Sequence, residues 1–254
     1  MIAIIDYGVG NLFSLKSSLE AIGQKAVVSG EQEVLDRASH IILPGVGAFG
    51  DAVQRLHDTG MFRAALYQAE QGKPLLGICL GMQMLLETSY EYGVHRGLGL
   101  IQGEVRPISE QIPEGLPVPH MGWNALSFGK EKSPLFAEVE EGEHVYFVHS
   151  YAGVGCGAQC VAVTEYGAPL TAAVQDKNVY GTQFHPEKSG KTGLKIAGSL
   201  AFCRLGLALP SAALAAAWKE MDFGFLYTGR IRFSVLAPPL AALGVGGILF
   251  SKLA

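Results

Sequence analysis

The clearest indication of the fold comes from one stretch, Pro74-Leu75-Leu76-Gly77-Ile78-Cys79-Leu80-Gly81-Met82-Gln83. A short apolar run comes first, a cysteine between two glycines follows, and an apolar-periodic segment continues to Glu87. This order predicts a strand, a sharp turn and a helix. Such a turn strains its central residue, and small neighbours let the backbone pass so that the side chain projects. Because the helix dipole and its free N–H groups favour a thiolate, Cys79 is a candidate nucleophile; a buried cysteine in a glycine-rich turn is the alternative.

Short apolar runs alternate with helical patterns before this stretch. The runs are Ile2–Ile5, Lys25–Val28 and His40–Leu43, and the helical patterns cover 12–22, 31–37 and 51–71. Strands that alternate with helices at this spacing predict a parallel sheet with helices on both faces. Ligand sites in such sheets lie beyond the carboxyl ends of the strands. We therefore expect an α/β fold whose site gathers the residues that follow each strand.

The chain after Glu87 departs from this alternation. Four prolines between Gly103 and Pro119 exclude a long helix there, and Trp123 is expected in a polar loop. Four closely spaced runs predict an antiparallel section: 144–150, 160–166, 170–175 and 179–184. A helix is expected over 193–204. The expected fold is a mostly parallel central sheet flanked by helices, with an additional antiparallel section.

Composition narrows the classes of function. The chain has 254 residues, of which 49% are hydrophobic, and this is enough for one substantial core. Its net charge is -4 with no basic run, which does not favour nucleic acid as a partner. The four cysteines form no CxxC pair and no zinc spacing, so we expect reduced thiols in a cytoplasmic protein without a metal site. Residues 1–12 lack the basic and long apolar regions of a signal peptide.

A glycine-rich loop, Pro44-Gly45-Val46-Gly47-Ala48-Phe49-Gly50, follows the third apolar run. A phosphate cradle is one interpretation, but the loop has no Gly-Lys-Ser/Thr element. The alternative is a set of backbone N–H groups that turn toward an anion. Gly45 and Gly47 adopt positive φ without penalty, so a flexible peptide here is expected to complete an oxyanion hole.

A cysteine nucleophile needs a base, and the base needs an acid that orients it. His185 follows a predicted strand, and the extended backbone before Pro186 places His185 and Glu187 on the same side. Glu187 then holds the imidazole while the other ring nitrogen faces the sulfur. A turn with a surface carboxylate is the alternative for these three residues alone.

Three motifs together resemble the class I, triad-type glutamine amidotransferases, which have a flavodoxin-like α/β fold. The motifs are Pro44–Gly47, Gly77–Gln83 and His185–Glu187, and the likeness extends from Met1 to about Arg204. The resemblance implies that Cys79 attacks the glutamine carboxamide and that His185, oriented by Glu187, transfers the protons. It implies an oxyanion hole formed by Leu80 and the loop Gly45, Val46 and Gly47. It implies no cofactor and no metal.

The resemblance also implies a substrate site and a protein partner. Gln83, Glu91, Ser150 and Tyr151 match positions where the family holds the carboxylate and ammonium groups of glutamine. Four further motifs, Asp6–Asn11, Pro119–Asn124, Tyr146–Tyr151 and His185–Ser189, are similar to one branch of the family. In that branch a separate (β/α)8-barrel cyclase subunit uses the ammonia. The resemblance places Asn11, Trp123 and Lys188 at or near the interface with that subunit.

Two questions stay open at this level. Residues 1–204 are expected to form the amidotransferase domain, and residues 205–254 depart from the family pattern. This apolar extension is interpreted as a poorly ordered terminus, an extra packed segment or a membrane anchor; Pro238-Pro239 argues against the last. Alternative functions are a subunit that supplies ammonia to another synthase, such as that of pyridoxal phosphate, and a non-catalytic scaffold of the same fold.

Overall fold

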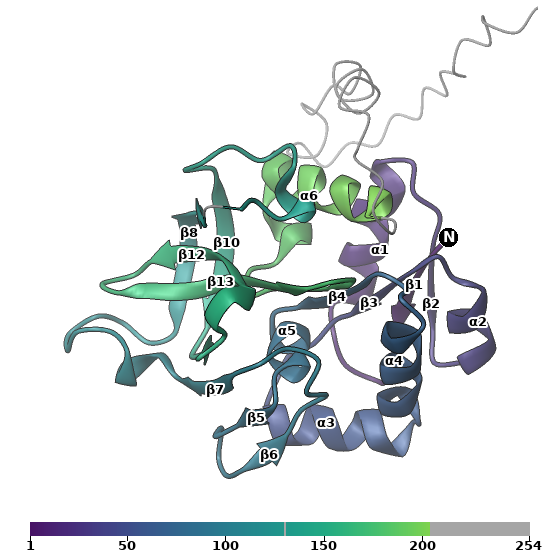
Figure 1. Ribbon diagram of the computed structural model, residues 1–254, viewed down its shortest axis with the longest axis horizontal. Helices are drawn as coiled ribbons and strands as arrows, with labels where there is room; N and C mark the ends of the chain where they lie inside the picture. Colours follow the sequence, from purple (N-terminus) through teal and green to yellow (C-terminus); the bar gives the residue numbers. More distant parts are fainter. Residues whose placement is uncertain (130, 204–254) are drawn as a thin grey trace, which may run out of the picture. The chain divides into compact units, whose positions relative to one another are not determined.

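An eight-stranded sheet forms the centre of the described chain (Figure 1). The computed structural model describes residues 1–129 and 131–203, so the predicted extension 205–254 lies outside the described residues. The strand order is β2-β1-β3-β4-β14-β13-β12-β9. The first five are parallel: β2 (Ala26–Ser29), β1 (Ile2–Ile5), β3 (His40–Leu43), β4 (Leu75–Ile78) and β14 (Val179–Thr182).

The far side of this sheet is the antiparallel section predicted from the closely spaced runs. Here β14 pairs with β13 (Pro169–Asp176), which pairs with β12 (Cys160–Glu165) and then β9 (Ser127–Phe128). The sheet is therefore mixed and mostly parallel, as expected.

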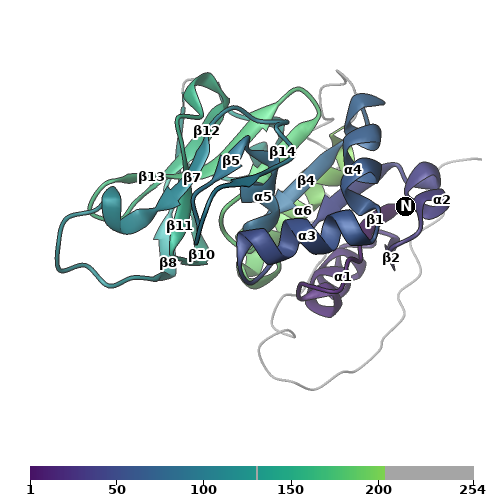
Figure 2. The ribbon, with the colours of Figure 1, turned by 90° about the horizontal axis from the view of Figure 1, so that it is seen from below.

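Helices cover both faces of the parallel strands (Figures 1 and 2). One face carries α1 (Leu12–Ala21) and α6 (Gly190–Phe202), as Figure 1 shows. The opposite face carries α2 (Gln32–Arg37), α3 (Phe49–Asp58), α4 (Met61–Glu70) and α5 (Leu80–Leu85). None of the helices in the described ranges is both long and apolar enough to cross a membrane.

Strand alternation explains why the two faces have separate cores. In β1, Ala3 and Ile5 join the buried cluster beneath α3 and α4, whereas Ile2 and Ile4 join the cluster beneath α1 and α6. Successive side chains of a strand point to opposite faces, so a strand buried on both sides is apolar throughout. This is the short uniform apolar run seen in the sequence.

Two smaller sheets flank the site. One pairs β8 (His120–Ala125) with β10 (His144–His149), and the other has the order β11-β7-β5-β6. Its strands are β5 (Thr88–Ser89), β6 (His95–Arg96), β7 (Glu104–Pro107) and β11 (Tyr151–Val154). The expected polar loop around Trp123 is therefore wrong. Trp123 lies opposite Tyr146 in the β8–β10 ladder, because partner strand β10 supplies the hydrogen bonds that a local sequence pattern cannot reveal.

Candidate active site

Cys79 lies in a strained turn between β4 and α5. Its φ of 54° and ψ of −111° are rare for a residue with a side chain. Glycine is required on both sides: a Cβ at Gly77 would lie 2.5 Å from the carbonyl oxygen of Gly81, and one at Gly81 would collide with that of Leu43. The N–H of Cys79 donates to the carbonyl of Thr182 at 2.7 Å. The turn thus has the geometry predicted for a nucleophile, and its sulfur borders a cavity.

His185 reaches the cysteine because β4 and β14 are parallel neighbours whose carboxyl ends lie side by side. Its Nδ1 is 2.8 Å from Oε1 of Glu187, and both side chains are 4% exposed. Burial lowers the pKa of His185, but hydrogen bonding with Cys79 and Glu187 outweighs it and raises the pKa to about 9. The Glu187 carboxylate is buried, which excludes the surface-carboxylate alternative. An imidazolium held beside a sulfur in this way can stabilise a thiolate.

The glycine-rich loop after β3 approaches the first turn of α5. A Cβ at Gly45 would lie 2.7 Å from the backbone nitrogen of Gly81, so only glycine allows this approach. Gly47 has the expected positive φ, 95°, but Gly45 does not, and there glycine is needed for space. The Tyr7 hydroxyl donates to the carbonyl of Pro44 at 2.8 Å and connects the loop to the segment that follows β1. The loop and the N–H groups that begin α5 therefore face the same region.

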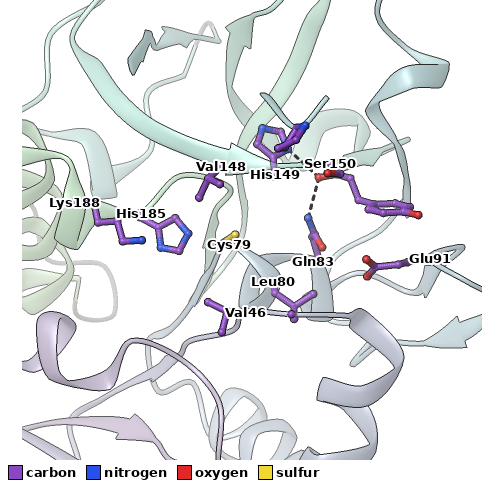
Figure 3. Close-up of a pocket in the computed structure, with 13 residues that line it drawn as sticks. Val46, Cys79, Leu80, Gln83, Glu91, Val148, His149, Ser150, His185 and Lys188 are labelled. Atoms are coloured by element: carbon purple, nitrogen blue, oxygen red, sulfur yellow. Dashed lines mark hydrogen bonds between the residues drawn. The ribbon is translucent and has the colours of Figure 1, made fainter. Parts of the chain in front are cut away.

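A cavity of about 350 Å³ connects these groups (Figure 3). Its lining residues are Val46, Gly47, Cys79, Leu80, Gln83, Glu91, Pro119, Val148, His149, Ser150, Tyr151, His185 and Lys188. Figure 3 shows His185 and Lys188 on one side of Cys79, with Gln83 and Glu91 on the other. The described residues hold no group of three or more His, Cys, Asp or Glu side chains arranged for a metal ion.

Comparisons with known proteins agree with this geometry. The profile of the family described as glutamine amidotransferase class-I matches residues 3–196. The chain belongs to the class-I glutamine amidotransferase family. It is 46% identical over 208 residues to the imidazole glycerol phosphate synthase subunit HisH of Wolinella succinogenes, covering 81% of this chain and all of that one. It is 50% identical over 199 residues to HisH of Geobacillus thermodenitrificans, covering 77% and 92%.

Solved structures show the same fold. PurLQS from Thermotoga maritima aligns with a TM-score of 0.62 and 23% identity over 79% of this chain and 97% of that chain. A crystal structure described as a glutamine amidotransferase aligns with a TM-score of 0.60 and 19% identity, covering 78% and 100%.

In this amidotransferase the four expected substrate residues all line the cavity. Gln83 Nε2 donates to the carbonyl of Tyr151 at 2.9 Å and to Oε1 of Gln183 at 3.0 Å. Glu91 accepts the N–H of Phe49 at 2.7 Å, and burial raises the pKa of its carboxyl. The carbonyl of Ser150 accepts the N–H of Ile108 at 2.9 Å, so it is already used within the fold.

Of the expected interface residues, Lys188 lines the amidotransferase cavity, and Asn11 lines a small separate pocket with His185 and Glu187. Asn11 and Lys188 are exposed, and Lys188 Nζ lies 5.8 Å from the centre of the Tyr146 ring. Trp123 is 53% exposed and packs edge-on against Tyr146 at a centroid distance of 5.8 Å. Tyr146 thus joins Trp123 and Lys188 into one surface.

Two groups of functional candidates were missed from the amidotransferase sequence. Gln183 is fully buried and its Nε2 lies 3.7 Å from Sγ of Cys79. His120 and His149 are buried neighbours whose ring nitrogens lie 3.0 Å apart. A polar residue at or just beyond the end of a strand is the signal available in each case. It does not reveal the partner, because the contacting residues are 104 and 29 positions apart.

Proposed function

We propose that the chain is the glutaminase subunit of imidazole glycerol phosphate synthase. It hydrolyses glutamine to glutamate and ammonia and passes the ammonia to a separate cyclase subunit, which makes imidazole glycerol phosphate and AICAR in histidine biosynthesis. The observation that carries the proposal is the buried His185–Glu187 pair placed beside a cysteine on a strained turn. The choice of synthase is supported by relatives of that name that are 46% to 50% identical. We place the subunit in the cytoplasm, where histidine precursors and reduced thiols occur together.

The mechanism follows from the placement of the three side chains. Sγ of Cys79 attacks the side-chain carboxamide carbon of glutamine, and its proton resides on His185. The N–H of Leu80 and an N–H of the Gly45–Gly47 loop stabilise the oxygen of the tetrahedral intermediate. His185 then protonates the nitrogen as the carbon–nitrogen bond breaks, which releases ammonia and leaves a γ-glutamyl thioester.

Hydrolysis of the thioester completes the cycle. His185, now neutral, takes a proton from a water molecule that attacks the thioester carbonyl. Breaking the carbon–sulfur bond releases glutamate and returns sulfur and imidazolium to their starting states. Glu187 orients the ring throughout and stabilises its positive charge. Gln83, Glu91, Ser150 and Tyr151 border the end of the cavity where the amino-acid portion of glutamine is held.

A second subunit is part of this proposal because free ammonia is lost in water. At neutral pH it becomes ammonium, which is not a nucleophile. The proposed docking surface surrounds the cavity mouth and contains Asn11, Met121, Trp123 and Lys188. Met121 is 60% exposed and Trp123 is 53% exposed, and large exposed apolar side chains are typical of protein interfaces. The proposed partner is a (β/α)8-barrel cyclase.

Glutamate release distinguishes the proposal from its alternatives. Full-length chain is assayed with glutamine alone, with the cyclase subunit, and with the cyclase and its nucleotide substrate; the Cys79→Ala variant is the blank. Activity that requires both additions supports the proposal. Activity independent of the cyclase refutes the assigned partner and favours another synthase. Absence of activity under all conditions favours the scaffold.

The interface is tested separately. Trp123→Ala is expected to weaken cyclase binding about 10-fold to 100-fold, as truncation of a central aromatic anchor does. Tyr67→Ala, also a half-exposed aromatic but on α4, is the matched control. Equal affinity of Trp123→Ala and the unmodified chain in a binding titration would refute the docking surface.

A further inference from the structure

A row of hydrogen-bonding groups begins at the wall of the cavity, where His149 and Tyr151 lie, and continues inward to Asn124. Asn124 Oδ1 lies 2.9 Å from His120 Nε2, His120 Nδ1 lies 3.0 Å from His149 Nε2, and His149 Nδ1 lies 2.9 Å from the carbonyl oxygen of Tyr151. His120 is fully buried and His149 is 6% exposed. The proposed reaction uses neither ring. Their buried polar atoms nevertheless form three contacts of hydrogen-bond length.

Both ends of this row accept hydrogen bonds. Tyr151 contributes a backbone carbonyl, which has no proton to donate. Asn124 Nδ2 donates to the carbonyl of Glu165 at 3.1 Å, so the amide oxygen must face His120. Each end therefore requires a ring N–H: one on His120 Nε2 and one on His149 Nδ1.

The contact between the two rings requires a third proton. A neutral imidazole carries one N–H, so two neutral rings supply two protons for three contacts. One contact would then bring two lone pairs to about 3.0 Å, which is repulsive. A pair with one additional proton, an imidazolium sharing a proton with an imidazole, satisfies all three.

Burial opposes this additional proton when the cavity is empty. It lowers the pKa of His149 to about 4; the contact with Tyr151 opposes the shift, and positive charge at His120 and His185 adds to it. Burial likewise lowers the pKa of His120. The other titratable groups near the pair are the phenol of Tyr166 stacked on His120, the phenol of Tyr151, and the cavity groups Cys79, Glu91 and Lys188. In the empty site burial therefore opposes the third proton that the contact between the two rings requires.

Glutamine changes this balance because it brings a carboxylate. Figure 3 shows Gln83 and Glu91 on one side of Cys79. Lys188 and His185 lie on the opposite side. Glu91 suits the ammonium group of an amino acid, whereas at that end of the cavity His149 is the lining side chain able to carry positive charge. An anion next to a ring favours the protonated ring.

We propose that His120 and His149 together take up one proton when glutamine binds, and that the resulting imidazolium–imidazole pair stabilises the bound carboxylate. This inference rests on the proposed glutaminase function. His149 lines the cavity and presents the positive charge to the carboxylate. His120 is a positioning residue that shares the proton. Binding then becomes linked to pH: above the pKa of the occupied pair, glutamine affinity falls about tenfold for each pH unit.

Nitrogen NMR of the full chain tests the proton count directly. The Cys79→Ser variant, with 15N-labelled histidines, holds glutamine without hydrolysing it. We expect two protonated nitrogens among the four of His120 and His149 in the free chain, and three with saturating glutamine. Two in both states, or three in both, would overturn the inference.

Calorimetry in buffers of different ionisation enthalpy measures the same uptake. Glutamine binding to Cys79→Ser should take up about one proton at neutral pH. His120→Phe keeps the stacking on Phe147 and Tyr166 but removes both nitrogens, so the uptake should fall close to zero. His144→Gln, an exposed residue at the other end of β10, is the control that should keep it.

The outcomes separate the two proposals. Binding of glutamine without proton uptake, or uptake that persists in His120→Phe, refutes the shared proton and leaves the glutaminase function intact. Failure of glutamine to bind even when the cyclase subunit is present refutes both. The NMR count on the unaltered histidine pair decides the question even where His120→Phe does not fold.

Discussion

Replacing Glu187 with glutamine removes one charge from the site while nearly preserving its shape. The carboxylate receives His185 Nδ1–H on Oε1 at 2.8 Å, and its other oxygen is buried without a hydrogen-bond partner in the described structure. In Glu187→Gln the amide oxygen can still accept from Nδ1, so the ring keeps its orientation. The new NH2 group, however, occupies the position of the unpartnered oxygen, and the imidazolium loses its counter-charge.

The size of the effect follows from the pKa of His185. The pKa of about 9 exceeds the ordinary value of 6.5, despite burial, because of Cys79 and Glu187. Loss of the Glu187 charge should lower the pKa by about 1 to 2 units, or roughly 1.4 to 2.7 kcal/mol of preference for the charged ring. The same loss of stabilisation applies to the imidazolium as it transfers its proton in the transition state, where about 1.4 to 2.7 kcal/mol is a factor of about 10 to 100 in rate. We expect kcat for glutamine hydrolysis to fall about 10-fold to 100-fold, within the range of a displaced acid–base group.

Two measurements check this expectation. Glutamate release gives kcat, and the rate of alkylation of Cys79 by iodoacetamide as a function of pH reports thiolate supported by His185. Glu114→Gln is the control, because it neutralises an exposed carboxylate that is distant in sequence from Glu187. A Glu187→Gln enzyme with kcat within about twofold of the unmodified chain and an unchanged alkylation profile would refute the assigned role of the pair.

Three further changes test other parts of the site. Gln183→Leu removes the N–H directed at Cys79 Sγ, so we expect both glutamate release and alkylation to slow about tenfold without loss of fold; unchanged rates would contradict the contact. Gly81→Ala forces a Cβ against the carbonyl of Leu43 and should cost more than about 2 kcal/mol of unfolding free energy, whereas Gly47→Ala, with open space around its Cβ, should cost about 1 kcal/mol; similar urea midpoints would refute this. His149 has a folded pKa of about 4, below that of the unfolded chain, so stability should fall as pH falls from about 6.5 to about 4. Between about pH 7 and 5.5 the loss is about 1 kcal/mol, and His149→Gln should remove it in denaturant titrations.

The local order of strands, turns and helices could be predicted because each depends on neighbours in the chain. Uniform apolar runs identified the parallel strands, and Gly77 and Gly81 around Cys79 identified the strained turn. Pro186 indicated that His185 and Glu187 lie on the same side, and their 2.8 Å contact confirms this. The residues that carry the family likeness were therefore visible without any tertiary contact.

The pairing of strands from distant segments could not be predicted from the sequence. Trp123 lies in a strand because β10 pairs with β8, and nothing within a few residues of Trp123 reveals β10. Gln183 contacts Cys79 because β14 lies next to β4, and the His120–His149 contact depends on the register of a ladder. These contacts also set how strongly each group is buried, and burial in turn sets its charge.

From the sequence alone, candidates for a cysteine nucleophile, its base and its orienting acid could be identified, since each is marked by its own short motif. How these side chains are brought together depends on tertiary contacts. The parallel pairing of β4 and β14 brings His185 and Gln183 to the sulfur, and the β8–β10 ladder places buried His120 against His149, which lines the cavity. Hydrogen bonding and desolvation depend on distance in space, which separation along the chain does not specify.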